Sequence, residues 1–311
     1  MNLNDLELGS TKEITLLVRK IENATSSNGL TYQKLLVRDR EEHETVLFNF
    51  EDRVNVKAPF IAKINVETDS YREAKSHKLK RIEIQSNADM NPYMPKSEID
   101  ARESWKTIVT LNKELRPVLR KVVGRVLSNN MEKFCVLPLS QGKAYARQNG
   151  ILEATVCLTQ LAQSASKTFA SLDRDLLLAG AIVYYVGAVD LLDAAYNENP
   201  NDALIGIAVS SHDKLIQVCN HYLSLSEDAD EMELAMKKLI MEGHEDIRSL
   251  NHILLSRTKG IPAALPEALV LRHLDQIVTD VDWIRTGLQE AEPGTVMRMN
   301  GIRIYRTGEK L

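Results

Sequence analysis

Apolar and polar residues alternate along residues 1–90 in the two-residue repeat that predicts β-strands. The turn-rich segment Asn23–Gly29 interrupts this repeat after the first strand. About five short strands with a long first loop and a long fourth loop are typical of an OB-type barrel, with an SH3-like barrel or a small sandwich as the alternative. The expected strands are Glu13–Ile21, Thr31–Asp39, Thr45–Phe50, Ala58–Glu67 and Lys78–Gln85.

After the polar, proline-containing stretch Ser86–Pro95, apolar residues recur at helical spacing instead. Ser97 is the expected cap of the first helix, because acidic residues follow it in the first turn. The run Leu176–Val183 has almost no polar break, which predicts a buried helix at the centre of this part. The other expected helices include Ile151–Lys167, Ala203–Ser224, Asp228–Gly243, Glu245–Ser256 and Pro266–Arg285.

These patterns predict an α+β multidomain protein in which a small N-terminal OB-type β-barrel precedes an all-α helical domain. We expect the barrel, of a nucleic-acid-binding type, in residues 1–88 and a linker in residues 89–96. The helical domain is expected in residues 97–290. A C-terminal tail, residues 291–311, would carry a short strand at Gly301–Arg306.

The composition is that of an ordinary globular protein, with 26% charged residues and a net charge of −4. Any nucleic-acid contact must therefore come from a local basic patch. The three cysteines form no CxxC pair, so we expect buried free thiols in a reducing compartment. The polar, acidic N-terminus does not resemble a secretory signal, and no apolar run approaches the ~20 residues of a membrane span. We therefore expect a cytoplasmic protein without membrane contact.

The second and third expected strands carry a candidate platform for single-stranded nucleic acid. Alternation places Tyr32, Lys34 and Arg38 on one face of the second strand. On the third strand, Phe48 shares a face with Val46 and Phe50. Exposed rings on which bases stack, with cations that follow the phosphates, are typical of single-strand binding. The alternative is that Phe48 and Phe50 fill the barrel core.

A basic segment, Ser70–Arg81, is expected to form the fourth loop of the barrel, where an OB-fold clasps a strand. Cations far outnumber acidic residues in it, so it extends the candidate nucleic-acid site. A merely solvated charged loop is the alternative. The candidate binding residues of the segment are Lys75, Lys78, Lys80 and Arg81.

A series of short stretches, in order over most of the chain, matches the pattern of a known family. These stretches are Tyr32, Phe134, Pro138, Gly150–Thr155, Asp175–Gly180, Leu204–Gly206, His252–Ser256, Pro266–Ala268 and Asp275. Together they resemble the YhaM-type bacterial 3′–5′ exoribonucleases, which join an N-terminal OB-fold to an HD domain. The resemblance implies that residues 97–290 form an HD-like domain and that the protein is a homo-oligomer.

HD enzymes hold one or two divalent metals with histidines and aspartates, and the metal generates the attacking hydroxide. The resemblance places the family's paired histidines at Ala144 and Tyr145, and its next histidine at Ala154. The His-Asp pair falls at Tyr184 and Tyr185. These phenols would fill the volume that metals and their ligands leave, and their hydroxyls would need partners.

The later ligand positions are changed as well. The family's next histidine falls at Ile207, and its Ser-His-His stretch reads Ser256–Thr258. Asp275 keeps its matching residue, and it is the expected hydrogen-bond partner of the two phenols. Tyrosine and alanine cannot replace imidazole and carboxylate on a divalent ion at neutral pH. The resemblance therefore predicts a degenerate HD domain with no catalytic residues, no metal and no other cofactor.

Three functions remain open from the sequence. The first is a non-catalytic protein that binds single-stranded DNA or RNA through its OB-fold, with the inactive HD domain as a scaffold, oligomerisation or partner surface. The second is an active metal-dependent 3′–5′ exonuclease whose site has moved. The third is a regulatory protein that binds a nucleotide or a protein partner in the old HD pocket. We take the first as the main hypothesis.

Overall fold

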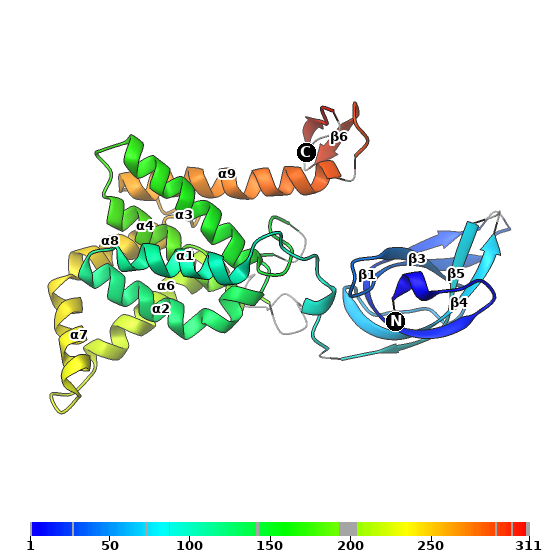
Figure 1. Ribbon diagram of the computed structural model, residues 1–311, viewed down its shortest axis with the longest axis horizontal. Helices are drawn as coiled ribbons and strands as arrows, with labels where there is room; N and C mark the ends of the chain where they lie inside the picture. Colours follow the sequence, from blue (N-terminus) through cyan, green and yellow to red (C-terminus); the bar gives the residue numbers. More distant parts are fainter. Residues whose placement is uncertain are drawn as a thin grey trace. The chain divides into compact units, whose positions relative to one another are not determined.

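The computed structural model describes residues 2–26, 28–71, 74–86, 88–140, 143–192, 204–289, 291–299 and 301–308. The chain forms two compact units, and the first is built mainly from Met1–Pro95. The second begins at Lys96. The first unit is a barrel of strands and the second is helical, as the residue patterns predict (Figure 1).

The first unit is a closed five-stranded barrel with the neighbour order β1-β2-β3-β5-β4 (Figure 1). Strands β3 and β5 pair in parallel, and the other pairs are antiparallel. This arrangement confirms the predicted OB-type barrel. The strands are β1 (Thr11–Thr25), β2 (Thr31–Arg38), β3 (Glu44–Asn49), β4 (Phe60–Tyr71) and β5 (Ala74–Ile84).

The predicted alternation along β2 is confirmed. Gln33, Leu35 and Val37 point into the barrel and are buried, while the residues between them are partly exposed. The barrel core consists mainly of aliphatic side chains from all five strands, together with Phe60. Because buried and partly exposed residues alternate along β2 and at the end of β3, the faces of Tyr32 and Phe48 are fixed by the burial of their neighbours.

The basic segment Ser70–Arg81 is not the loop that the sequence analysis predicts. Strand β4 continues to Tyr71 and β5 starts at Ala74, so most of the segment lies in a paired hairpin. The prediction is wrong because it rests on the side-chain pattern, and the outer part of the hairpin has few apolar side chains. Backbone pairing between β4 and β5 stabilises the strands there instead. The lysines therefore project from a strand. Arg72, which also belongs to this basic segment, lies outside the described residues.

The second unit packs its helices around one apolar core, with α4 at its centre. Every residue of α4 from Leu176 to Val183 is buried, as the uninterrupted apolar run predicts. Among the described residues, no helix is long and apolar enough to cross a membrane. The helices are α1 (Ala101–Lys113), α2 (Pro117–Val136), α3 (Gly150–Thr168), α4 (Arg174–Val183), η3 (Val186–Asp190), α6 (Gly206–Leu223), α7 (Glu231–Glu242), α8 (His244–Leu255) and α9 (Pro266–Gln289).

Three local predictions need correction. Asp100, not Ser97, caps α1, because its carboxylate accepts hydrogen bonds from two backbone N–H groups of the first turn. The tail strand β7 (Ile302–Tyr305) pairs with a strand that the pattern did not predict, β6 (Val296–Met299), in a hairpin after α9. Of the three free thiols only Cys219 is buried, and the other two are half-buried.

Candidate nucleic-acid interface and the predicted metal positions

Three aromatic rings gather on the outside of the barrel. The Tyr32 ring on β2 stacks on the Phe50 ring just after β3, with centroids 5.1 Å apart. It also meets the Phe48 ring at 6.1 Å. Phe50 is 54% exposed and Phe48 is only partly buried, so neither fills the barrel core. We call Tyr32, Phe48 and Phe50 the aromatic cluster.

Two lysines flank the aromatic cluster on neighbouring strands. Lys34 on β2 is the direct pairing partner of Phe48 on β3, and Phe48 is in turn the partner of Lys78 on β5. Directly paired residues project to the same face of a sheet. A phenyl ring therefore lies between two cations across three adjacent strands. Base stacking on rings and phosphate attraction by lysines need such an arrangement.

Most of the other predicted cations are engaged by neighbours. Arg38 shares the Glu44 carboxylate with Arg19, at the far end of β2 from Tyr32. Lys75 donates to the Leu6 carbonyl oxygen at 3.0 Å. Within the part of the chain that the structure describes, Lys34 makes no ion pair. On β5, Lys78 pairs with Asp69 at 2.9 Å and Lys80 pairs with Glu67 at 3.1 Å, whereas the exposed Arg81 has no ion pair among the described residues.

A buried amide pair beneath the aromatic cluster was missed by the sequence reasoning. Gln33 accepts from the Val54 backbone N–H at 2.8 Å and donates to the Val54 carbonyl oxygen at 3.1 Å. Asn49 donates to Gln33 at 3.2 Å and accepts from the Glu51 backbone N–H at 3.0 Å. These bonds fix the chain on both sides of Phe50. Two amide residues at inward-facing positions of predicted strands were the available signal.

In the helical unit, Tyr184 and Tyr185 follow α4 and are fully buried, with their rings nearly perpendicular at 5.5 Å. The Tyr185 hydroxyl donates to Asp275 Oδ1 on α9 at 2.5 Å, so the expected partnership is confirmed for this phenol. The Tyr184 hydroxyl is buried without a hydrogen-bond partner among the described residues. Burial raises the pKa of both phenols, which keeps them neutral.

Arg257, from the turn after α8, completes this cluster. Its guanidinium lies 3.9 Å from the centroid of the Tyr184 ring and 5.2 Å from that of Tyr185. It also donates to the Tyr184 carbonyl oxygen and lies 3.6 Å from Asp275 Oδ2. A fixed organic cation therefore stands over two phenol faces and beside a carboxylate.

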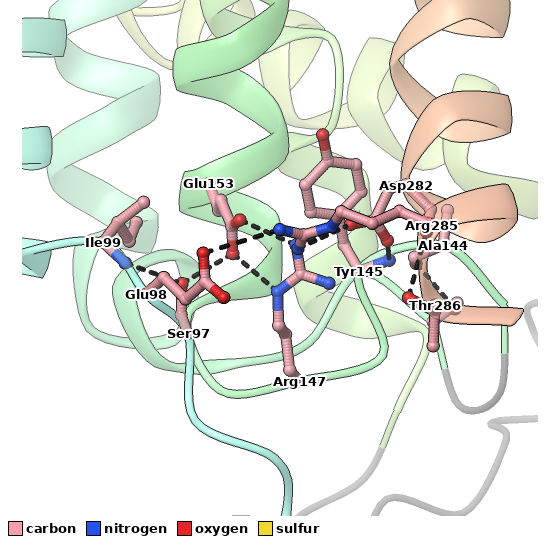
Figure 2. A network of polar contacts seen from close by, with 11 residues as sticks. Ser97, Glu98, Ile99, Ala144, Tyr145, Arg147, Glu153, Asp282, Arg285 and Thr286 are labelled. Atoms are coloured by element: carbon pink, nitrogen blue, oxygen red, sulfur yellow. Dashed lines mark hydrogen bonds and ion pairs between the residues drawn. The ribbon is translucent and has the colours of Figure 1, made fainter. Parts of the chain in front are cut away.

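Tyr145 belongs to a second cluster, which Figure 2 shows. Its backbone N–H donates to Asp282 Oδ2 at 2.6 Å, and its φ of 54° lies in the left-handed region. Arg147 donates to both carboxylate oxygens of Glu153, at 2.8 and 2.7 Å, and to Asp282 Oδ1 at 2.6 Å. Ser97, which does not cap α1, donates to Glu153 instead at 2.6 Å.

Comparison with known proteins gives matches over nearly the whole chain. The chain is 24% identical over 305 residues to the 3′-5′ exoribonuclease YhaM of Listeria welshimeri, covering 94% of this chain and 92% of that protein. It is 22% identical over 305 residues to the YhaM of Bacillus subtilis, covering 93% of this chain and 91% of that one. The chain is therefore similar to the YhaM-type exoribonucleases over nearly its whole length. No family model and no solved structure matches it.

The residues at the predicted metal positions do not fit a divalent ion of the kind that a YhaM-type HD domain implies. One oxygen of Asp275 accepts from Tyr185 and the other faces the Arg257 guanidinium. A divalent ion beside Asp275 would meet a positive charge and two neutral phenols, rather than imidazole and carboxylate. Among the described residues, no group of three or more His, Cys, Asp or Glu side chains could hold a metal ion.

The structure brings only some of the YhaM-type metal positions together. Tyr184, Tyr185 and Asp275 meet in one cluster. Tyr145 joins Asp282, seven residues further along α9 than Asp275. Arg257, from the stretch Ser256–Thr258 that matches the family's Ser-His-His, joins the first cluster. Two other positions join neither cluster: Ala154 is buried within α3, and Ile207, at the start of α6, packs against the core beside Gly187.

Proposed function

We propose that this chain binds single-stranded nucleic acid on the outer face of β2, β3 and β5 and does not cleave it. The observation that carries the proposal is the stacked Tyr32–Phe50 pair beside Phe48, with Lys34 and Lys78 on either side. Each base that stacks on a ring contributes about 1–3 kcal/mol. The relatives' name, 3′-5′ exoribonuclease, supports nucleic acid as the ligand class.

The same proposal assigns the helical unit, residues 97–290, the role of an inactive scaffold. Its support is the Arg257 cluster, in which an arginine and two neutral phenols surround Asp275. Hydrolysis by this type of domain needs a hydroxide bound to a metal. The cation of this cluster is the Arg257 guanidinium, which cannot act as a Lewis acid toward water. As an oligomerisation surface, the scaffold would bring several barrels onto one strand, which size-exclusion chromatography with light scattering tests.

The binding test uses fluorescence anisotropy with labelled single-stranded RNA and DNA and with duplex. The double variant Tyr32→Ala/Phe50→Ala removes the stacked pair, and we expect it to weaken single-strand binding at least tenfold. Phe169→Ala is the matched control, because Phe169 is a similarly exposed ring, 57% accessible, on the helical unit. Equal affinities of the double variant and the control would contradict the proposed platform.

A further inference from the structure

A hollow of about 410 Å³ opens beside the Arg257 cluster in the helical unit. Arg257, Thr258 and Lys259 line it from the turn after α8, and Arg272 lines it from α9. The chain closes the hollow with the turn Gly260–Pro262. The hollow is separate from the aromatic cluster and from the network that Arg147 forms with Glu153 and Asp282.

The charge around this hollow is unbalanced. Arg257 lies 3.6 Å from one carboxylate oxygen of Asp275, and the other oxygen accepts a hydrogen bond from Tyr185. Lys259 and Arg272 are exposed, and neither makes an ion pair within the described part of the chain. Three cations therefore face one carboxylate, which leaves a local charge of +2.

A second, independent feature is a buried hydroxyl group at the same hollow. Thr258 lines the hollow, and its Oγ1 is buried without a hydrogen-bond partner among the described residues. A buried hydroxyl without a partner costs free energy, and such groups commonly serve a bound water, ion or ligand. The neighbouring Tyr184 hydroxyl is unpartnered as well.

We propose that this hollow binds a phosphate monoester. The dianion of such a group matches the charge of +2, since its second pKa is about 6. Guanidinium groups bind phosphate oxygens through paired N–H donors, and Arg257 and Arg272 both line the hollow. The Thr258 hydroxyl, buried at its wall, would add a donor on rotation of its side chain. The phosphate can come from a free mononucleotide or from the phosphorylated end of a strand. The inference goes beyond strand binding by the barrel, and it holds whether or not the aromatic cluster binds bases.

Calorimetry on the full chain tests the site with inorganic phosphate, adenosine 5′-monophosphate and adenosine as probes. We expect the two phosphate compounds to bind and adenosine not to bind. Arg272→Ala should weaken phosphate binding at least tenfold, and Arg272→Lys should restore part of it. Arg248→Ala is the matched control, because Arg248 is an exposed arginine on α8 that pairs only with Glu245. Arg272 is exposed and makes no ion pair among the described residues, so we expect its removal to leave the fold intact.

The proposal is overturned if inorganic phosphate does not bind, if adenosine binds as well as its monophosphate, or if Arg272→Ala binds phosphate as the control does. Displacement of the nucleotide by a 5′-phosphorylated strand, but not by its unphosphorylated form, would identify a strand end as the source. Failure to displace it would identify the free nucleotide. The Tyr32→Ala/Phe50→Ala variant should bind phosphate normally, which separates this site from the barrel.

Discussion

The Tyr185 hydroxyl donates a 2.5 Å hydrogen bond to Asp275, across ninety residues of sequence. It joins the end of α4 to α9 in the middle of the helical core, where Tyr185 is 1% exposed. Asp275 is the one residue that matches the metal-ligand pattern of the YhaM-type resemblance, and here it accepts from a phenol and faces an arginine. The carboxylate thus has a structural role that can be measured without any nuclease assay.

Replacing this phenol tests the structural role. Tyr185→Phe leaves one oxygen of a mostly buried carboxylate without its donor, so we expect the helical unit to lose about 1–3 kcal/mol of stability. Urea unfolding followed by tryptophan fluorescence measures this unit alone, because Trp105 and Trp283 both lie in it. Tyr305→Phe, at a tyrosine 56% exposed on β7, is the control and should change little. Equal unfolding midpoints for the two variants would contradict the role of the bond.

Arg147 and Arg285 both lie beside the carboxylate of Asp282, but they differ in burial. Arg147 is buried and bonded to Glu153 and Asp282, so Arg147→Met should cost about 3–5 kcal/mol because it removes the ion pair of Glu153 and leaves Asp282 with the more distant Arg285 as its cation. Arg285 lies 3.6 Å from Asp282 and is far more exposed, so Arg285→Met should cost less than about 1 kcal/mol. The same tryptophan-detected unfolding compares them. Similar losses for both would show that the network does not stabilise the unit.

The pH dependence of the barrel should depend on Asp39. Burial alone would raise the pKa of this carboxyl, but hydrogen bonds from the backbone of Leu3, His43 and Glu41 and from the His43 ring lower it below its ordinary value. A lowered folded-state pKa contributes stability above the unfolded value of about 3.9, and this stability is lost as the pH falls through the folded-state pKa.

Asp39→Asn should therefore destabilise the barrel by about 1–2 kcal/mol at pH 7, and the difference from the unmodified chain should shrink as the pH is lowered below 4. Urea unfolding followed by nuclear magnetic resonance signals of β2 and β3 measures the barrel separately. If the difference in unfolding free energy between the two chains stays constant from pH 7 to pH 2, the charged form of Asp39 does not stabilise the barrel.

The flanking lysines should control the salt dependence of binding. Each phosphate contact to a single strand contributes about 0.7 to the slope of log affinity against log salt concentration. Lys34→Ala and Lys78→Ala should each reduce the slope by about that amount and weaken binding to all sequences similarly. Lys238→Ala, at an exposed lysine on α7, is the control. Slopes that match the control would place the phosphates elsewhere.

Local patterns predict much of this fold. Alternation on β2 assigned Tyr32 outward and Leu35 inward, and the apolar run 176–183 predicted the buried helix α4. Both features depend on burial of neighbouring residues, which a short window of sequence records. The strands Ala58–Glu67 and Lys78–Gln85 were predicted, but the outer part of their hairpin was missed because residues such as Lys75 pair through the backbone, which the side-chain pattern does not record.

Contacts between distant segments explain the rest. Arg147 and Asp282 are 135 residues apart in the sequence. Arg257 lies in the turn after α8 and donates to the carbonyl oxygen of Tyr184, which follows α4. No local pattern specifies such partners. The resemblance matches Arg257 to a ligand position, but it does not specify that the guanidinium lies over the two phenol rings and beside Asp275.

One measurement tests the central claim most directly. A 5′-labelled single-stranded RNA is incubated with the chain and manganese, and the same sample is examined for binding by anisotropy and for length by gel. The account predicts saturable binding that Tyr32→Ala/Phe50→Ala removes, with a strand of unchanged length. Manganese-dependent shortening of the strand that Asp275→Ala abolishes would contradict it.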